Sequence, residues 1–312
     1  MKWLLPVMGV VFFGAACADR GDPPEAAAPA PREAVAAPIP SPAEQAHAKG
    51  GVSLLSTTHA TIVGGRKVEP GTFMAVVGLV RKGERLPSCS GTLVAPDIVL
   101  TAAHCICAKA HAHVYMGHDP TRRMAGAGYL QVRAWRSAMT CGRGDLRDGL
   151  DLALLRIDTA PDFPGFRLAE ASEVDAASAV RVVGFGAIDR AGRVFDHHKR
   201  EADVVMASPD CGAAQNDATV ATTYGCQRAH EIVAGSRDSP DTCDGDSGGP
   251  LFVAVGGDST GADEGSLRLA GVTSRPTRER DDECGDGGIY ERLDARAVAW
   301  INDAARRLRA RG

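Results

Sequence analysis

The sequence predicts an all-β domain arranged as a sandwich or a barrel, and three observations favour this fold class. Beyond residue 61, apolar residues occur in short runs that are broken by Gly, Pro and Asp. No long segment with helical spacing separates these runs, so parallel βαβ units are not expected. The 312 residues include 36 Gly and 18 Pro, a composition typical of a chain with many turns.

Each apolar run is short enough for one strand, and the turn residues beside it set its ends. The last segment differs, because Asp294 is a suitable N-cap and Val298, Ile301 and Leu308 recur at helical spacing through an Arg-rich tail. We therefore predict a helix over about residues 294–310, with its arginines on a solvated face. The predicted strands span residues 75–80, 92–94, 98–101, 152–157, 180–183, 203–206, 251–255 and 267–272.

Residues 1–17 are predicted to be an export leader, since Lys2 precedes an apolar run that is too short to span a bilayer comfortably. Two processing sites stay open. A cut after Ala18 fits a small-x-small pattern, whereas residues 14–17 resemble a bacterial lipoprotein box that would place a lipid on Cys17. The protein is thus expected to be exported, either secreted or tethered to a bacterial cell envelope.

Composition separates a linker from a folded domain and excludes several classes of protein. Residues 18–61 are rich in Ala, Pro, Glu and Ser, which cannot bury a core, so they are predicted to form a linker and propeptide. A net charge of -4 argues against a dedicated nucleic-acid binder, and 44% hydrophobic residues are too few for a multi-span membrane protein. Nine cysteines indicate an oxidising compartment.

Three separate segments carry a nucleophile, a base and an acid. Ser247 lies between glycines directly before an apolar run, His104 ends another run, and Asp151 begins a third. A serine hydroxyl is a poor nucleophile until a neutral imidazole takes its proton, and the imidazole needs a carboxylate on its other nitrogen. The glycines let backbone N–H groups converge beside the serine. The three segments together indicate acyl-transfer chemistry.

Four motifs in this order resemble those of the trypsin/chymotrypsin-like serine proteases. They are Ile-Val-Gly-Gly at 62–65, Thr-Ala-Ala-His-Cys at 101–105, Asp-Leu-Ala-Leu-Leu at 151–155 and Gly-Asp-Ser-Gly-Gly-Pro at 245–250. The resemblance extends from Ile62 to the C-terminus and implies a protease domain over residues 62–312. That domain would contain two six-stranded antiparallel β-barrels, at about 62–168 and 169–293, followed by the C-terminal α-helix.

The resemblance also assigns roles at the expected site in the cleft between the barrels. Ser247 would be the nucleophile, His104 the general base and later the acid, and Asp151 the orienting carboxylate. The backbone N–H groups of Gly245 and Ser247 would form the oxyanion hole, and Ser274 would bond the triad carboxylate. No metal and no cofactor are expected, and the partners would be protein or peptide substrates.

In this family, cleavage before the Ile-Val-Gly-Gly motif activates a zymogen. The new α-ammonium group of Ile62 would pair with the buried carboxylate of Asp246, because neither charge tolerates burial alone. One departure is informative, since Thr61 precedes the cut where self-activating relatives have Arg or Lys. A separate activating protease is therefore expected.

Asp241 matches the acid at the floor of the specificity pocket in trypsin-like members, and Gly288 matches a glycine of the pocket wall. The expected specificity is thus for Arg or Lys before the cut, with a chymotrypsin-like preference as the narrower alternative. After Ser274 the family usually has Trp-Gly, whereas this chain has Arg275 and Pro276. Because proline has no N–H, a main-chain contact to the substrate is in doubt.

Eight of the nine cysteines are expected to form four disulfides, and one cysteine remains. By resemblance, Cys89 pairs with Cys105, Cys243 with Cys284, and Cys211 with Cys226; we pair Cys107 with Cys141 by elimination, and Cys17 is either lipidated or removed.

Three alternative interpretations concern a zinc site, a calcium site and the function of the whole domain. The pairs Cys105-x-Cys107 and His111-x-His113 lack the spacing of a zinc site. The acidic run 281–283 is more typical of a solvated loop than of a calcium site. In the rival function, the chain is a catalytically inactive protease homologue that acts as a binding module.

Overall fold

The computed structural model describes residues 62–108, 110–122, 127–142, 146, 149–160, 165–236, 239–277 and 284–310. The expectations for the leader and linker, including those for Cys17 and Thr61, lie outside the described residues, as does the acidic run 281–283. Within the described ranges, no helix combines the length and apolar character needed to cross a membrane.

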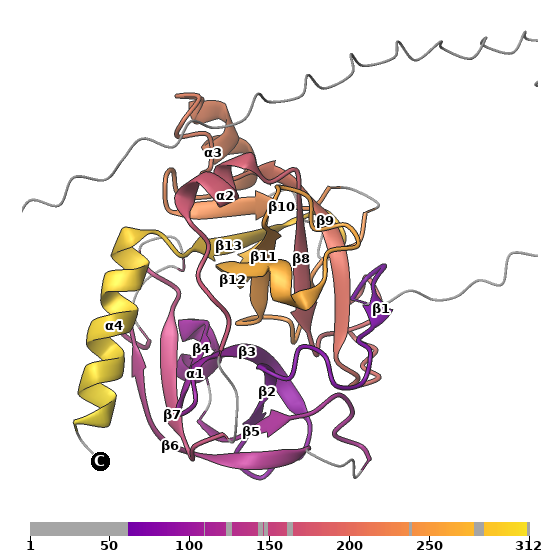
Figure 1. Cartoon of the computed structure of the whole chain (residues 1–312), viewed down its shortest axis with the longest axis vertical. Helices are drawn as coiled ribbons and strands as arrows, with labels where there is room; N and C mark the ends of the chain where they lie inside the picture. Colours follow the sequence, from indigo (N-terminus) through magenta and orange to yellow (C-terminus); the bar gives the residue numbers. More distant parts are fainter. Residues whose placement is uncertain are drawn as a thin grey trace, which may run out of the picture. The chain divides into compact units, whose positions relative to one another are not determined.

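The first barrel is a closed antiparallel sheet in the lower half of Figure 1. Its strand order is β2-β3-β4-β7-β6-β5. The strands are β2 (Val76–Arg81), β3 (Pro87–Ala95), β4 (Ile98–Thr101), β5 (His111–Met116), β6 (Gly128–Ser137) and β7 (Ala153–Ile157).

The second barrel lies above the first in Figure 1 and follows the order β9-β10-β13-β12-β11-β8, with a β8–β9 pairing that closes the ring. The short β1 (Arg66–Lys67) adds to the edge of β9. The two six-stranded antiparallel barrels confirm the predicted fold class. The strands are β8 (Ala179–Gly184), β9 (Arg200–Ser208), β10 (Glu231–Ala234), β11 (Pro250–Ala254), β12 (Leu267–Pro276) and β13 (Gly288–Arg292).

The predicted C-terminal helix is α4 (Ala295–Arg309), which packs along β6 and β7 of the first barrel (Figure 1). The Asp294 carboxylate caps it by accepting a hydrogen bond from the Ala297 N–H. Ile301 and Leu308 are buried, as the helical spacing predicts. The C-terminal helix thus joins the second barrel to the outside of the first.

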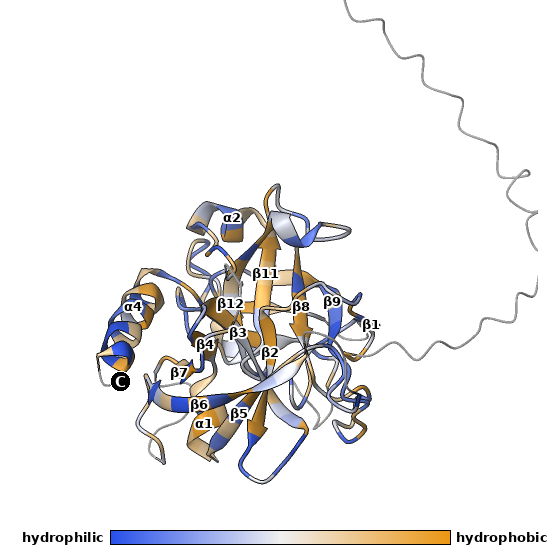
Figure 2. Ribbon diagram, turned by 60° about the horizontal axis from the view of Figure 1, so that its bottom comes forward, coloured by the Kyte–Doolittle hydropathy of each residue, from blue (hydrophilic) through white to orange (hydrophobic). Residues whose placement is uncertain are grey.

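Several elements were not predicted from the sequence. In β6, side chains alternate between half-buried and exposed, with Leu130 and Val132 inward and Gln131 and Arg133 outward. A search for continuous apolar runs overlooks such a strand, which is partly hydrophilic in Figure 2, whereas the buried β11 is hydrophobic throughout. The short helices are less than two turns long and leave no periodic pattern. They are α1 (Ala103–Ala108), α2 (Ala171–Ala176), α3 (Ala218–Tyr224) and the 3-10 turn η2 (Glu264–Ser266).

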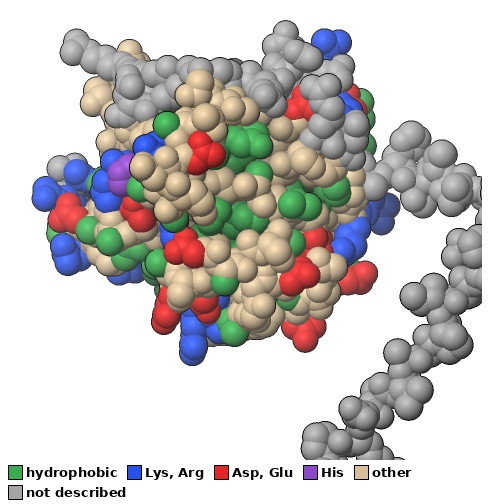
Figure 3. Space-filling view, turned by 90° about the horizontal axis from the view of Figure 1, so that it is seen from above, with side chains coloured by type: hydrophobic (Ala, Val, Ile, Leu, Met, Phe, Trp, Pro, Cys, Tyr) green, Lys and Arg blue, Asp and Glu red, His purple; other side chains and the backbone are tan. Residues whose placement is uncertain are grey.

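Aromatic packing joins the two barrels. Phe252 on β11 is fully buried, with its ring centroid 4.3 Å from Phe166 and 5.9 Å from Phe73. On the face shown in Figure 3, acidic and basic side chains are interspersed among the side chains drawn in colour. The aromatic cluster of Phe73, Phe166 and Phe252 is therefore one of the contacts that join the barrels.

Replacing Phe252 by alanine should lower the free energy of unfolding by about 3–5 kcal/mol, because the cavity lies between tightly packed rings. Chemical denaturation of a Ser247→Ala background measures this. Val205→Ala, at a side chain 57% exposed on β9, is the control and should change stability by about 0.5 kcal/mol or less. A loss below about 1 kcal/mol at Phe252 would show that this cluster does not support the fold.

Candidate active site

The Asp151 carboxylate is fully buried two residues before β7 and receives hydrogen bonds from both barrels. Its Oδ1 accepts the backbone N–H of His104 at 2.9 Å. Its Oδ2 lies 2.7 Å from Nδ1 of His104 and accepts the Ser274 hydroxyl at 2.7 Å. Since an ionised carboxylate only accepts, Nδ1 carries the proton and Nε2 is left as the basic nitrogen.

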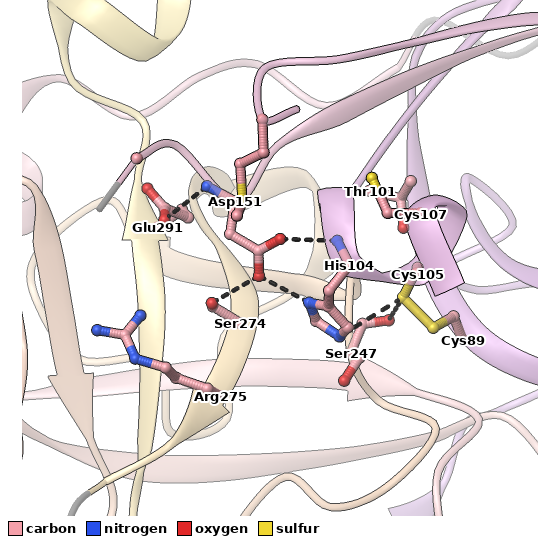
Figure 4. A network of polar contacts seen from close by, with 12 residues as sticks. Cys89, Thr101, His104, Cys105, Cys107, Asp151, Ser247, Ser274, Arg275 and Glu291 are labelled. Atoms are coloured by element: carbon pink, nitrogen blue, oxygen red, sulfur yellow. Dashed lines mark hydrogen bonds and ion pairs between the residues drawn. A yellow bond between two sulfur atoms is a disulfide. The ribbon is translucent and has the colours of Figure 1, made fainter. Parts of the chain in front are cut away.

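Ser247 lies on the Nε2 side of the His104 ring, opposite Asp151 (Figure 4). The Cys105 sulfur is 3.8 Å from His104 Nε2 and 3.5 Å from the Ser247 carbonyl oxygen, which places both residues against one disulfide. His104 comes from α1 of the first barrel, whereas Ser247 precedes β11 of the second. The structure thus brings together the three side chains that the sequence selected.

Ser90 on β3 fixes the loop that carries Ser247. Its N–H donates to the Ser247 carbonyl at 2.8 Å, and its hydroxyl donates to the Gly245 carbonyl at 2.9 Å. A Cβ on Gly248, whose φ is +81°, would lie only 2.5 Å from the Ser90 carbonyl oxygen. The loop therefore approaches β3 as closely as only glycine allows.

The N–H groups of Gly245 and Ser247 donate no hydrogen bond to any residue in the described part of the chain. The neighbouring amides are engaged, with Asp246 donating to the Cys243 carbonyl at 2.9 Å and Gly248 to Thr273 at 2.8 Å. Two unengaged donors on either side of one residue can stabilise a developing oxyanion.

Asp246 is 1% exposed and lies in a niche made by glycines. Its Oδ1 accepts the Gly186 N–H at 2.8 Å and its Oδ2 accepts the Cys243 N–H at 3.0 Å. A Cβ on Gly184 or Gly186 would lie 2.2–2.3 Å from a carboxylate oxygen, so no other residue fits. Burial, together with the charges of Asp241 and Asp244, raises the pKa of Asp246 to about 7 despite these two donors.

Ile62 and Val63 lie beside the segment that carries Asp241. The Ile62 side chain is fully buried in the core of the second barrel, and the Val63 carbonyl accepts the Asp241 N–H at 2.9 Å. Ile62 has a φ of +23°, which is unusual for a β-branched residue.

A cavity opens beside Ser247 and contains the predicted specificity residues. Its lining includes Asp241, Asp244, Asp286 and Gly288. Asp241 is 2% exposed, and its carboxylate accepts the N–H groups of Gly285 and Gly287 at 3.0 Å each. Arg275 also lines the cavity, but its guanidinium is paired with Glu231, so the three carboxylates favour a positively charged occupant.

Arg275 points away from His104 in Figure 4. Its guanidinium forms two hydrogen bonds with the buried Glu231, at 2.6 and 2.8 Å. On the neighbouring β13, the buried Glu291 accepts the Asp151 N–H at 2.8 Å. Sequence reasoning did not single out Glu231 or Glu291.

The remaining predicted positions are the paired cysteines and the two histidines of the alternative zinc site. The four disulfides join the same cysteine pairs that the sequence reasoning gave, namely Cys89–Cys105, Cys107–Cys141, Cys211–Cys226 and Cys243–Cys284. Because Cys105 and Cys107 are oxidised, neither offers a thiolate to a metal. His111 and His113 lie on β5, where His113 packs edge-on against Tyr129.

Two residues that support the site were missed. Ser90 is an unremarkable serine in the sequence, and its role follows only from the contact between barrels. An acid that directly follows a short apolar run, as Glu291 follows Gly-Ile-Tyr, is the signal that could have identified a buried carboxylate.

In the chain that retains Thr61, stability should fall as pH rises from about 4 to about 7 because of Asp246. The folded state holds this proton more tightly than the unfolded chain, so ionisation opposes folding, by about 4 kcal/mol at most. Denaturant unfolding at a series of pH values should show a shallower decline for Asp246→Asn. An identical slope in both proteins would contradict the assignment.

The comparisons with known proteins agree with this geometry. The family model described as Trypsin matches residues 62–301. A trypsin from Saccharopolyspora erythraea is 27% identical over 75% of this chain and 94% of that protein, and a chymotrypsin-like elastase family member 1 from Rattus norvegicus is 24% identical over 79% and 90%. The structure of neuropsin, a serine protease expressed in the limbic system of mouse brain, has a TM-score of 0.57 and 25% identity, covering 77% of this chain and 97% of that one.

A family match over most of the chain, on two closed barrels whose loops bring His104, Asp151 and Ser247 together, places this chain in the trypsin family of serine proteases.

Proposed function

We propose that this protein is a serine endopeptidase that hydrolyses peptide bonds after Arg or Lys, using Ser247, His104 and Asp151. The observation that carries the proposal is the Asp151–His104 pair, with Ser247 on the free Nε2 side of the imidazole (Figure 4). The acceptor on Nδ1 fixes the tautomer that a general base requires.

In this mechanism the Ser247 Oγ attacks the scissile carbonyl carbon while Nε2 of His104 takes the hydroxyl proton. The carbonyl oxygen becomes an oxyanion between the N–H groups of Gly245 and Ser247. His104 then gives its proton to the leaving amine, and the acyl-enzyme forms. Water then attacks the acyl-enzyme ester while His104 takes its proton, and His104 returns that proton to the Ser247 oxygen as the acid product leaves. Asp151 stabilises the transient imidazolium and keeps the ring in place.

Specificity is assigned to the cavity next to Ser247. A substrate Arg or Lys side chain would reach Asp241, whose buried carboxylate is kept in position by the amides of Gly285 and Gly287. A Cβ on Gly288 would lie 3.1 Å from the hydroxyls of Thr242 and Tyr290, so a side chain there would narrow the cavity. The substrate backbone would follow Arg275 and Pro276, where the proline offers a carbonyl but no N–H.

Activation would follow from cleavage between Thr61 and Ile62. The clash that makes a positive φ unfavourable involves the preceding carbonyl group, and hydrolysis removes that group from Ile62. The new α-ammonium would then supply the cation that the buried Asp246 lacks. Because the pocket favours Arg or Lys and the cut follows Thr61, a separate protease would perform the activation.

The proposal includes export, with residues 1–17 as leader and residues 18–61 as linker and propeptide. If Cys17 carries a lipid, the activating cut would also release the protease domain, because no other cysteine lies between residues 18 and 61. The alternative function is an inactive homologue that binds a partner through the same surface.

Labelling with an arginine-like organophosphonate separates an enzyme from a binding module. The chain cleaved before Ile62 should bind one equivalent covalently at Ser247, because only an activated hydroxyl attacks phosphorus. Intact-mass analysis should find no adduct on uncleaved chain or on Ser247→Ala. Failure of correctly cleaved protein to label would favour the binding module, and labelling of uncleaved protein would refute the activation scheme.

Asp241→Asn should reduce kcat/KM for Arg and Lys peptides on the order of 10²–10³-fold, since a buried ion pair with substrate loses one partner. Phe and Leu peptides should be affected far less. Asp286→Asn is the matched control, because it removes the same charge from the lining of the same cavity. Equal losses in the two variants, or equal losses on all four substrates, would contradict a specific role for Asp241.

A further inference from the structure

Glu291 is a fully buried acid that contacts the backbone of Asp151. Its Oε1 accepts the backbone N–H of Asp151 at 2.8 Å (Figure 4). Its Oε2 has no hydrogen-bond partner among the described residues. The carboxyl group is therefore directed at the one residue whose placement orients His104.

The charges around Glu291 do not balance an ionised carboxylate. Glu231 lies directly opposite on β10, and Asp151 adds a second negative charge. Arg275 is the facing cation, but its guanidinium is engaged by both oxygens of Glu231. Burial, with these two acids, raises the pKa of Glu291 to about 8. A protonated carboxyl group keeps a carbonyl oxygen for the Asp151 N–H without adding a charge.

We propose that Glu291 is a positioning residue which, in its protonated and neutral form, anchors the backbone of Asp151 and so aims the triad carboxylate at His104. This inference rests on the proposed function. The Asp151 N–H is buried, so without Glu291 it would be an unsatisfied donor and the backbone would shift to recover a partner. Small displacements of a catalytic group cost much of the rate.

Ionisation of Glu291 has the opposite effect. A carboxylate beside Asp151 and Glu231 repels both, which weakens the alignment that the neutral acid maintains. Activity should therefore contain a component that falls as pH rises through about 8. The Ile62 α-ammonium is also lost at alkaline pH, so the two effects must be separated by variants that change only Glu291.

Two substitutions test the proposal on chain cleaved before Ile62. Glu291→Gln keeps the carbonyl acceptor and cannot ionise, so its kcat at pH 7 should stay within about twofold of the parent. Glu291→Leu keeps similar volume without an acceptor, so its kcat should fall on the order of tenfold, with KM changed less than about twofold. Equal kcat in the Leu variant and the parent, or equal losses in both variants, would overturn the anchoring role.

The ratio of parent kcat to Glu291→Gln kcat should fall as pH rises from 7 to 9, because only the parent can ionise at residue 291. Any contribution of Ile62 is the same in both proteins and cancels in the ratio. A constant ratio would overturn the role of the neutral form, even if the Leu variant fails to fold. Glu201→Gln is the matched control. It neutralises another buried acid of the second barrel, one paired with Arg66 and Arg181, and its ratio should stay constant.

A readout without turnover distinguishes this inference from the proposed function. In a Ser247→Ala background, the downfield proton NMR signal of the His104 Nδ1–H should be retained in Glu291→Gln and shifted or broadened in Glu291→Leu. A signal unchanged by the Leu substitution would refute the inference. Absence of peptidase activity in the cleaved parent, with this signal still responding to Glu291, would instead refute the proposed function.

Discussion

The buried carboxylate of Asp151 is the constraint on which the arrangement of the two barrels depends. A carboxylate without solvent is costly unless donors surround it, and no single barrel supplies enough of them. His104 contributes a backbone N–H and an imidazole N–H from the first barrel, whereas Ser274 contributes a hydroxyl from the second. All three donors reach the carboxylate only when the barrels meet in one register, so the contact between the barrels and the alignment of Asp151 with His104 have the same cause.

The loop before Ser247 meets a second constraint, which is close approach. Ser90 on β3 engages the carbonyl groups of both Gly245 and Ser247, so one residue of the first barrel sets the path of the loop in the second. Positive φ values at Gly245 and Gly248 let the chain follow that path. Along that path, Asp246 and Gly248 donate their N–H groups within the protein, whereas those of Gly245 and Ser247 donate to no described residue.

The sequence predicted the residues whose chemistry is recognisable in isolation and missed those whose role arises from contact between distant segments. Ser247 among glycines and Asp151 before an apolar strand carry local patterns, as does the Asp294 cap of α4. Continuous apolar runs located buried strands such as β4 and β11, but not β6, where only alternate residues face the core. Ser90 lies 155 residues from Gly245 in the chain, and no spacing rule connects them.

Arg275 shows how one departure from the family pattern reorganises the surroundings of the site. A large aromatic residue needs only apolar neighbours, whereas a guanidinium that is mostly buried needs an acid, and Glu231 provides it with both oxygens. Because the guanidinium of Arg275 is paired with Glu231, the neighbouring acid on the sheet, Glu291, has no free counterion among the described residues. Glu291 instead accepts a hydrogen bond from the backbone of Asp151. Arg275 and its partner Glu231, the neighbouring Glu291 and the backbone of Asp151 thus form one chain of contacts, so a change at Arg275 alters the electrostatics beside Asp151.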